Sequence, residues 1–220
     1  MTSLEKLRAA VDGHPLDEKP IIIWPSEGMQ SDAAILPLDR IVNRANKSRI
    51  VLAEVLSPFA RSLQKALGLN RVLQEDPKKG EEILDGLIKQ TLNEFAAARQ
   101  AGADGVFYRL QGAEPTYSSP MQYGGHYLET DREILQATWK DSLNVLFVEG
   151  GPETYLDFVS DLPATIFAWD CERTEVSLAT LRKLRKGALA TADPEADILF
   201  GSNYGILHQW VKQGVAATNA

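Results

Sequence analysis

Short apolar runs alternate with helix-type patterns along this chain of 220 residues. The apolar runs are the strands that we expect, at residues 21–24, 49–55, 106–108, 144–148 and 165–169, with a weaker one at 188–192. Continuous apolar runs of this kind are typical of strands that are buried on both faces. Strands that alternate with helices predict βαβ units and a parallel sheet.

The segments between these runs carry helix signals. The longest expected helix runs from Pro77 to about Ala101, with Asp76 as its N-cap and proline in its first turn. We expect the others at 3–11 with Ser3 as N-cap, at about 32–42, 58–67, 131–139, 152–159, 177–186 and 203–213. No change in composition marks a domain boundary, so residues 1–220 are predicted to form a single domain.

Composition narrows the class of protein. The net charge is −7, which gives no general attraction to nucleic acid or to anionic membranes. Cys171 is the single cysteine, which excludes an intrachain disulfide and a multi-cysteine zinc site. No apolar run approaches the roughly 18 residues of a membrane-spanning helix, and the N-terminus lacks a signal-peptide pattern. We therefore expect a cytoplasmic protein with a small-molecule ligand.

Polar side chains gather directly after the expected strands, at Glu27, Arg109, Glu149 and Asp170. In a parallel barrel the carboxyl ends of the strands form the face that carries the site. An open doubly wound sheet would place these residues similarly, so the pattern leaves both architectures open.

The region after the expected strand 106–108 holds the densest set of candidate residues. A loop of about 20 residues follows this strand, and loops of that length are usually functional or disordered. Its aromatic and histidine side chains argue against disorder. The loop and the flanking strand supply Tyr108, Arg109, Gln111, Tyr117, Tyr123 and His126.

Several segments resemble the uroporphyrinogen decarboxylase superfamily in collinear order. Residues 95–111 (FAAARQAGADGVFYRLQ) are similar to its "AGAD" helix-strand segment, and 144–151 (NVLFVEGG) falls where its methyltransferase branch has "lHxCG". Residues 164–170 (ATIFAWD) look like its "W-D" strand end, and 177–182 resemble the segment that follows. The resemblance implies a (β/α)8 barrel, with heme-pathway decarboxylation or zinc-dependent methyl transfer from corrinoid to thiol as family activities.

The chain is short for that superfamily. We therefore expect a reduced or incomplete TIM-type barrel of about six or seven parallel strands. A parallel barrel that lacks strands has open edges, which need to be covered. Helices or a second copy across a two-fold interface would cover them, so a homodimer is predicted.

The family's chemical motifs are altered in this chain. Where the decarboxylase has an arginine-rich motif, residues 24–30 read WPSEGMQ, so true uroporphyrinogen decarboxylation is not expected. At the "H-x-C" positions stand Phe147 and Glu149, and phenylalanine cannot bind a metal. A site from Glu149, His126, Cys171 and His208 is conceivable, but no spacing demands it. We assign no metal and no cofactor.

The remaining polar residues have natural roles in a ligand site. Arg109 could clamp a carboxylate, Glu149 or Asp170 could act as general base, and His126 as acid or base. The predicted ligand-binding residues are Trp24, Tyr108, Gln111, Tyr117, Tyr123 and Trp169. Two alternatives stay open: Arg109 forms a structural ion pair with Glu149 or Asp170, and the aromatic residues pack in the core.

The resemblance and these residues together predict a small carboxylated or tetrapyrrole-related ligand at the carboxyl end of a barrel, with lyase or methyl-transfer chemistry. The alternative is a non-catalytic relic that binds a ligand or a partner protein. An α/β hydrolase is disfavoured, since the chain has no G-x-S-x-G motif.

Overall fold

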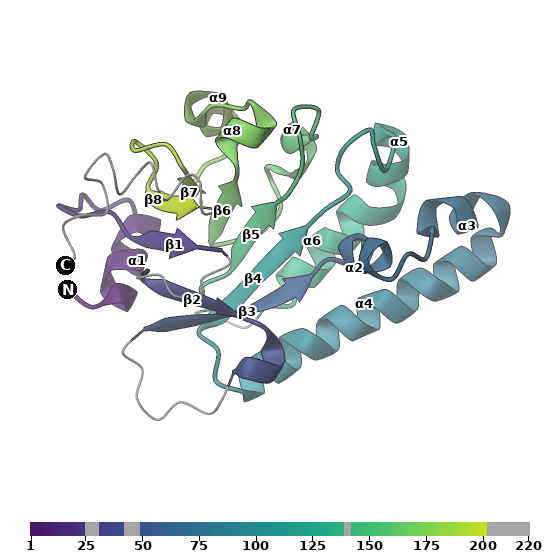
Figure 1. Cartoon of the computed structure of the whole chain (residues 1–220), viewed down its shortest axis with the longest axis horizontal. Helices are drawn as coiled ribbons and strands as arrows, with labels where there is room; N and C mark the ends of the chain where they lie inside the picture. The colour runs from purple at the N-terminus through teal and green to yellow at the C-terminus, as the bar shows by residue number, and fades with distance from the viewer. Residues whose placement is uncertain (25–30, 42–48, 139–141, 202–220) are drawn as a thin grey trace.

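The chain folds into a closed barrel of eight parallel strands in chain order (Figure 1). The computed structural model describes residues 1–24, 31–41, 49–138 and 142–201. The strands are β1 (Ile21–Ile23), β2 (Ala33–Leu36), β3 (Ile50–Leu56), β4 (Gly105–Leu110), β5 (Val145–Val148), β6 (Ile166–Trp169), β7 (Ala188–Thr191) and β8 (Ile198–Gly201). The barrel closes where β1 pairs with β8, from Ile21 opposite Leu199 to Ile23 opposite Gly201.

The fold class predicted from the sequence is confirmed, but the barrel is complete, so the strand count of six or seven is wrong. The two additional strands are β2 and β8. The run Ala33–Leu36 has apolar spacing that fits one turn of a helix equally well. Its pairing with both neighbours makes it a strand, with Ala33 opposite Ile22 of β1 and with residues from Ala33 to Leu36 opposite Ile50 to Ala53 of β3. Strand β8 is only four residues long and directly follows a turn, so its periodicity carries little signal.

The helices are, in order, α1 (Ser3–Val11), η1 (Leu38–Arg40), α2 (Pro58–Gln64), α3 (Leu69–Glu75), α4 (Pro77–Gln100), α5 (Pro120–Tyr123), η2 (Gly124–Leu128), α6 (Glu129–Gln136), α7 (Leu156–Val159), α8 (Cys171–Thr174) and α9 (Leu178–Leu184). The helix expected at about 32–42 is replaced by β2 and the short η1. Thr2 rather than Ser3 caps α1, in a capping box with Glu5. The helix expected at 203–213 lies outside the described residues.

Two apolar shells pack against the strands, one inside the barrel and one outside it. The inner shell fills the barrel with side chains such as Leu52, Phe107, Phe147 and Phe200. Helix α1 adds Leu7 and Ala10 to this inner shell and so covers the end of the barrel where the strands begin. The outer shell lies between the strands and the helices that follow them.

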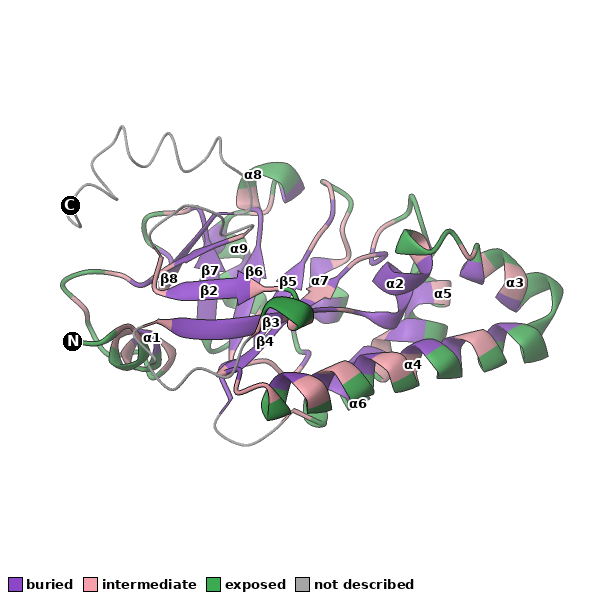
Figure 2. Cartoon of the chain, turned by 60° about the horizontal axis from the view of Figure 1, so that its bottom comes forward, coloured by how far each residue is buried: buried purple, intermediate pink, exposed green. Residues whose placement is uncertain are grey.

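Helix α4 is the longest element and extends well past the strands, where α2, α3 and α5 gather around its first half (Figure 1). Its buried side chains form a single stripe, and the opposite face is exposed (Figure 2). Asp76 Oδ1 accepts from the Lys79 N–H at 3.2 Å, which is the N-cap that the sequence predicts. Helices α3 and α4 pack closely at Gly80, where an added Cβ would lie 2.7 Å from the Leu73 Cα.

Closure of the barrel changes the argument for a dimer. All eight strands have a neighbour on each side, so the open edges that a second copy was expected to cover do not exist. Self-association therefore stays a prediction, but open strand edges no longer provide a reason for it. Across the described ranges, the structure contains no helix that is both long and apolar enough to span a bilayer.

Candidate functional site

Side chains at the carboxyl ends of the strands converge on the mouth of the barrel. Successive side chains of a strand point to opposite faces. Ile50 and Leu52 of β3 belong to the inner shell, so Glu54 lies on the same inner side one step further along. Phe107 and Phe147 also belong to the inner shell. By the same alternation Arg109 and Glu149, each two residues further along, lie on the inner side as well. Trp24, directly after β1, packs against this inner shell.

Arg109 is the centre of the mouth. Its Nε donates to Glu149 Oε2 at 2.6 Å, and its Nη1 lies 3.5 Å from Glu54 Oε1. The guanidinium carbon lies 4.5 Å from the centre of the Trp24 ring, a cation–π distance. The side chains of Arg109 and Glu54 are each 23% exposed and that of Glu149 is 15% exposed, so the group is shielded but reaches solvent.

An aromatic floor lies beneath this ionic group. The Trp24 ring is 5.8 Å from that of Phe107 and 5.7 Å from that of Phe147. Phe200 completes the floor, 5.0 Å from Phe147 and 6.1 Å from Phe107. These aromatic side chains fill the barrel below the mouth, so a ligand could enter only as far as the level of Trp24.

A second arginine reaches the mouth from outside the barrel. Arg173 in α8 places Nη1 3.6 Å from Glu149 Oε1, and its side chain is 59% exposed. Asp170, just before α8, is buried and accepts from the Arg173 N–H at 2.9 Å, so it caps this short helix. Asp170 therefore has a structural role here that explains its position without invoking chemistry.

The long loop after β4 is held by the loop after β5. Glu114 Oε2 accepts from the Gly151 N–H at 2.9 Å, and Tyr155 Oη donates to the Ser118 carbonyl at 2.9 Å. Gly112, with φ of +95°, lets the chain leave β4 against Phe59, because an added Cβ would lie 2.0 Å from that ring. Gln111, which lies in the chain between Arg109 and this turn, is half-buried.

Four predicted site residues lie elsewhere. Tyr108 and Trp169 are fully buried in the outer shell, because each is adjacent on its strand to an inward residue and so points outward. Tyr123 is fully buried with them, and the Trp169 Nε1 donates to the Val176 carbonyl at 2.9 Å. His126 is exposed on η2, 6.0 Å from the Tyr127 ring. Their assignment to the mouth is corrected by this placement.

Tyr117 also lies away from the mouth. It is 41% exposed, and its ring meets Phe59 edge-on at 6.3 Å. Its carbonyl accepts from Asn70 Nδ2 at 2.6 Å, which joins the loop to α3. Of the predicted set, the structure therefore brings together Trp24, Arg109 and Glu149. Gln111 follows Arg109 on the chain, and Asp170 caps α8 next to Arg173.

Two charged groups that matter were missed from the sequence. Glu54 interrupts an apolar strand at an inward position, and that alternation was the signal that could have identified it. Asp131, in the first turn of α6, accepts from the hydroxyls of Tyr108 at 2.6 Å and Tyr123 at 3.1 Å. Burial raises the pKa of Asp131 to about 7, although both hydroxyls act to lower it. Burial also raises the pKa of both tyrosines well above the ordinary value.

The described residues offer no obvious metal centre. No group of three or more His, Cys, Asp or Glu side chains within these ranges is placed to hold a metal ion. Cys171 is half-buried and packs against apolar neighbours. The predicted combination with His208 lies outside the described residues.

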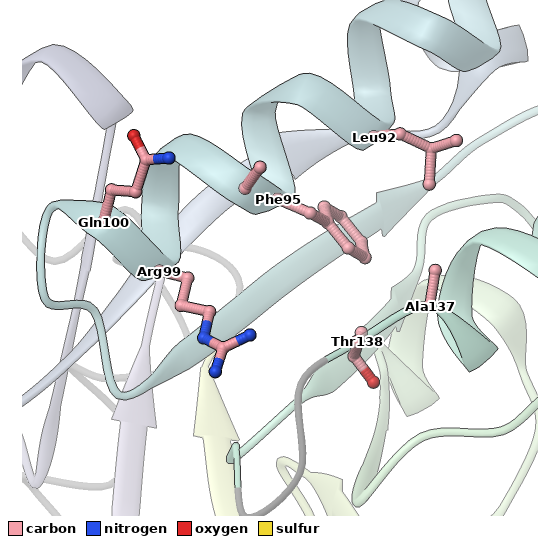
Figure 3. Close-up of a pocket in the computed structure, with 7 residues that line it drawn as sticks. Leu92, Phe95, Arg99, Gln100, Ala137 and Thr138 are labelled. Carbon is pink, nitrogen blue, oxygen red and sulfur yellow. The ribbon is translucent and has the colours of Figure 1, made fainter.

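A separate groove of about 790 Å³ lies on the outer surface between α4 and the end of α6 (Figure 3). Leu92, Phe95 and Arg99 line it from α4, with Ala137 and Thr138 opposite (Figure 3). Because Arg99 closely precedes β4 in the chain, this groove lies near the start of that strand, at the opposite end from the mouth. The two sites are thus distinct.

The fold is shared with a solved methyltransferase from Methanosarcina mazei. That structure matches with a TM-score of 0.67 at 13% identity, over 86% of this chain and 82% of the methyltransferase. At this identity the likeness establishes a common fold. No protein-family model matches the sequence, and no curated protein matches it either.

Two structures of an old yellow enzyme homologue from Zymomonas mobilis, NCR, also match in part. A variant of NCR has a TM-score of 0.39 at 12% identity, and the match covers 76% of this chain and 55% of the NCR chain. The other NCR structure has a TM-score of 0.33 at 13% identity, and the match covers 59% of this chain and 46% of the NCR chain. Similarity at this level adds nothing to the assignment of the site.

Proposed function

We propose that this chain is a compact enzyme of the uroporphyrinogen decarboxylase-like superfamily that binds a small carboxylated ligand at the barrel mouth. Lyase or methyl-transfer chemistry is the reaction class that the resemblance supports. One observation carries the proposal: two arginines converge on Glu149 above an aromatic floor, at the end of the barrel where sites of this fold lie.

The ionic group is arranged so that a ligand carboxylate can enter by exchange. Arg109 contacts its glutamates through Nε and Nη1, and its Nη2 has no partner among the described residues. The contact with Glu54 is the longer, at 3.5 Å, so it is the one that a ligand displaces more easily. A carboxylate bound to Nη1 and Nη2 would form the two-point contact that guanidinium groups favour.

Glu149 has the position of a proton-transfer group. Its Oε2 is held by Arg109 at 2.6 Å, which fixes the orientation of the carboxylate. Among the described residues, its Oε1 meets only the long contact with the exposed Arg173. That oxygen is available to accept a proton from a ligand bound above Trp24.

Flat or conjugated ligands fit this mouth better than long flexible ones. The Trp24 ring and the Arg109 guanidinium present an aromatic and a planar cationic surface next to each other. The filled barrel below prevents deep insertion, so the ligand would lie across the mouth. A tetrapyrrole-related compound or a small aromatic acid meets both conditions.

The alternative function is a ligand-binding protein without catalysis. It is favoured by the pairing of Arg109, which the two glutamates already neutralise, as a purely structural network would require. Within the described residues no His and Cys set matches the zinc ligands of thiol methyl transfer. Under this alternative the mouth binds the same ligands and turns none of them over.

Tryptophan fluorescence titration tests the proposal. The panel contains uroporphyrin, coproporphyrin, a corrinoid and several small aromatic carboxylates. We expect saturable quenching by at least one compound, with the Kd raised about tenfold or more in Arg109→Ala. Trp24→Phe should remove most of the signal, whereas Arg182→Ala, at a surface ion pair with Asp197, should change nothing. An absence of saturable binding across the panel contradicts the proposal.

Glu149→Gln separates the two functions. For an enzyme, this variant should still bind the ligand but lose turnover by about 10²-fold or more. If the unsubstituted protein binds a ligand and converts none of the panel, and Glu149→Gln binds equally well, the non-catalytic alternative is the better description.

A further inference from the structure

A fully buried carboxylate lies outside the mouth, between α6 and β4. Asp131 is 2% exposed and contacts Tyr108 and Tyr123 through its two oxygens. Its electrostatic surroundings contain these two hydroxyls and no cation among the described residues. A carboxylate that is buried in this way resists ionisation, because its charge would lose water without gaining a counter-ion.

The other charged groups near this cluster are already paired. The charge of Arg61 in α2 acts to lower the pKa of Tyr108. Arg61 is itself paired with Glu94 of α4, with Nη2 2.5 Å from Oε2. On α6 itself Arg132 pairs with Asp161 of the α7–β6 connection at 3.0 Å. Glu129 pairs with Arg132 at 3.3 Å, and both Glu129 and Glu133 are exposed. None of these groups compensates a charge on Asp131.

The segment that carries Asp131 has an irregular helix. Helix α5 passes into the wide π turn η2, which continues as α6 without a break. Tyr123, Tyr127 and Asp131 are all buried, so this face of the segment packs on the protein. Gly124, Gly125 and His126 are exposed on the other side. Wide turns of this kind frequently mark places where a helix has a functional role.

The cluster joins segment 120–136 to a strand of the barrel. Tyr108 belongs to a central barrel strand, while Tyr123 and Asp131 belong to the segment 120–136. Tyr127 of the same segment packs on Phe59 at 4.6 Å between ring centres. Separation of this segment from β4 would expose Asp131 to water, where a carboxylate ionises at its ordinary value.

We propose that Asp131 is a pH-sensitive latch, which keeps segment 120–136 closed on β4 while it is protonated and favours opening of the segment once it is ionised. Proton linkage determines the direction in which pH shifts the equilibrium between the closed and the open segment. The closed state binds the proton more tightly than the open state, so rising pH favours opening. The dependence ends above the pKa of the closed state, which is about 7.

The latch has a consequence for the barrel mouth. Segment 120–136 follows directly after the loop that leaves β4 beside Arg109, and that loop is tied to the β5 loop through Ser118 and Glu114. Opening of the segment would release one end of this loop. The latch itself does not depend on the ligand or the reaction proposed for the mouth, so each proposal can fail alone.

Amide hydrogen exchange tests the latch in the full-length protein. The measurement covers peptides from 120–136 at pH values between about 5 and 8, corrected for the intrinsic pH dependence of exchange. In the unsubstituted protein we expect the opening equilibrium to rise about tenfold per pH unit up to about pH 7 and then to level off. Asp131→Asn, which resembles the protonated carboxyl, should lose this dependence.

Two control variants separate Asp131 from its neighbours. Glu133→Gln removes an exposed carboxylate from α6, and His126→Gln removes the exposed titratable group of η2. Both should keep the tenfold dependence. Equal pH dependence in the unsubstituted protein and Asp131→Asn, or loss of the dependence in His126→Gln, would overturn the proposal.

A direct titration keeps the test decisive if Asp131→Asn folds poorly. Carboxyl NMR of the unsubstituted protein should show one aspartate with a midpoint near 7, and its transition should coincide with the change in exchange. An Asp131 midpoint near the ordinary value would equally overturn the latch.

Discussion

The guanidinium of Arg109 lies over the indole of Trp24, with 4.5 Å between the guanidinium carbon and the ring centre. These residues come from β4 and the end of β1, which are not neighbours in the barrel. Their contact therefore crosses the mouth, and the two glutamates hold the cation in place from β3 and β5. The contact therefore joins side chains from strands on different sides of the mouth.

A double-mutant cycle measures this contact. Arg109→Met and Trp24→Leu should each lower the free energy of unfolding, and the double variant should lose less than the sum. The coupling should be about 0.5–2 kcal/mol, the range for cation–π pairs from exposed to desolvated sites. The measurement is urea denaturation at neutral pH. Additive losses would show that the two side chains are only adjacent.

Substitution by alanine should have opposite effects on stability at two glycines. An added Cβ at Gly105 would lie 1.9 Å from the Leu143 carbonyl oxygen, whereas at Gly86, exposed on α4, it would meet nothing within 4 Å. Gly105→Ala should destabilise by about 2 kcal/mol or more, because backbone atoms must move. Gly86→Ala should stabilise by up to about 1 kcal/mol through helix propensity. Thermal unfolding distinguishes the signs, and equal shifts would contradict the close packing at β4.

Arg185 should be essential for the connection between α7 and β6. Its guanidinium donates to the carbonyls of Ser160 at 2.6 Å, Leu162 at 2.9 Å and Ala164 at 2.7 Å, and lies 5.1 Å from the Phe167 ring centre. Arg185→Ala leaves these carbonyls without their donor and should cost about 3 kcal/mol or more.

The neighbouring Lys186 provides the control for that experiment, since it is exposed and the same substitution there should change the unfolding free energy by less than about 0.5 kcal/mol. Arg185→Lys should recover part of the loss, because an ammonium group can satisfy some but not all of the carbonyls. Equal stability of the alanine variants at 185 and 186 would refute this role.

The buried Asp131 also predicts a pH dependence of global stability. Its pKa is raised from 3.8 to about 7 in the folded chain, so the folded state binds the proton more tightly than the unfolded state. The stability that this group contributes is complete below about pH 4 and is lost as pH rises to about 7. The loss is about 4 kcal/mol, at about 1.4 kcal/mol for each pKa unit.

Comparison with Asp131→Asn isolates this effect from the contributions of the other titratable groups. The unfolding free energy of the unsubstituted protein minus that of the variant should fall between about pH 4 and pH 7 and stay constant above. A constant difference over that range would mean that Asp131 titrates normally.

Local signals in the sequence were sufficient for much of the fold. Asp76 and Pro77 define the start of α4, and the stripe of apolar residues defines the face that it buries, because capping and helical periodicity act within a few residues. The alternation of strands and helices likewise indicated a parallel sheet, and the resemblance to a family of (β/α)8 barrels favoured a barrel over an open sheet. Arg109 and Glu149 were correctly placed near each other, since strand ends meet on one face.

The aromatic residues could not all be placed by the same reasoning. Tyr108 and Arg109 are adjacent on one strand and therefore face opposite sides, so they cannot both line the mouth. The sequence alone does not say which of them points inward, because both faces of a barrel strand are buried. The inner shell, filled from β3, β5 and β8, decides that Arg109 points inward.

The sequence by itself determined the class of fold, the long helix and the strand ends at which Arg109 and Glu149 meet, since each rests on periodicity, capping or the order of strands. Tertiary structure alone decided that β2 and β8 complete the barrel, that Glu54 joins Arg109, and that Asp131 is enclosed with two tyrosines. These features depend on strand register and on contacts between residues far apart in the chain. The physical reason is that short strands and buried charges carry almost no local signal: their neighbours become defined only when the barrel closes.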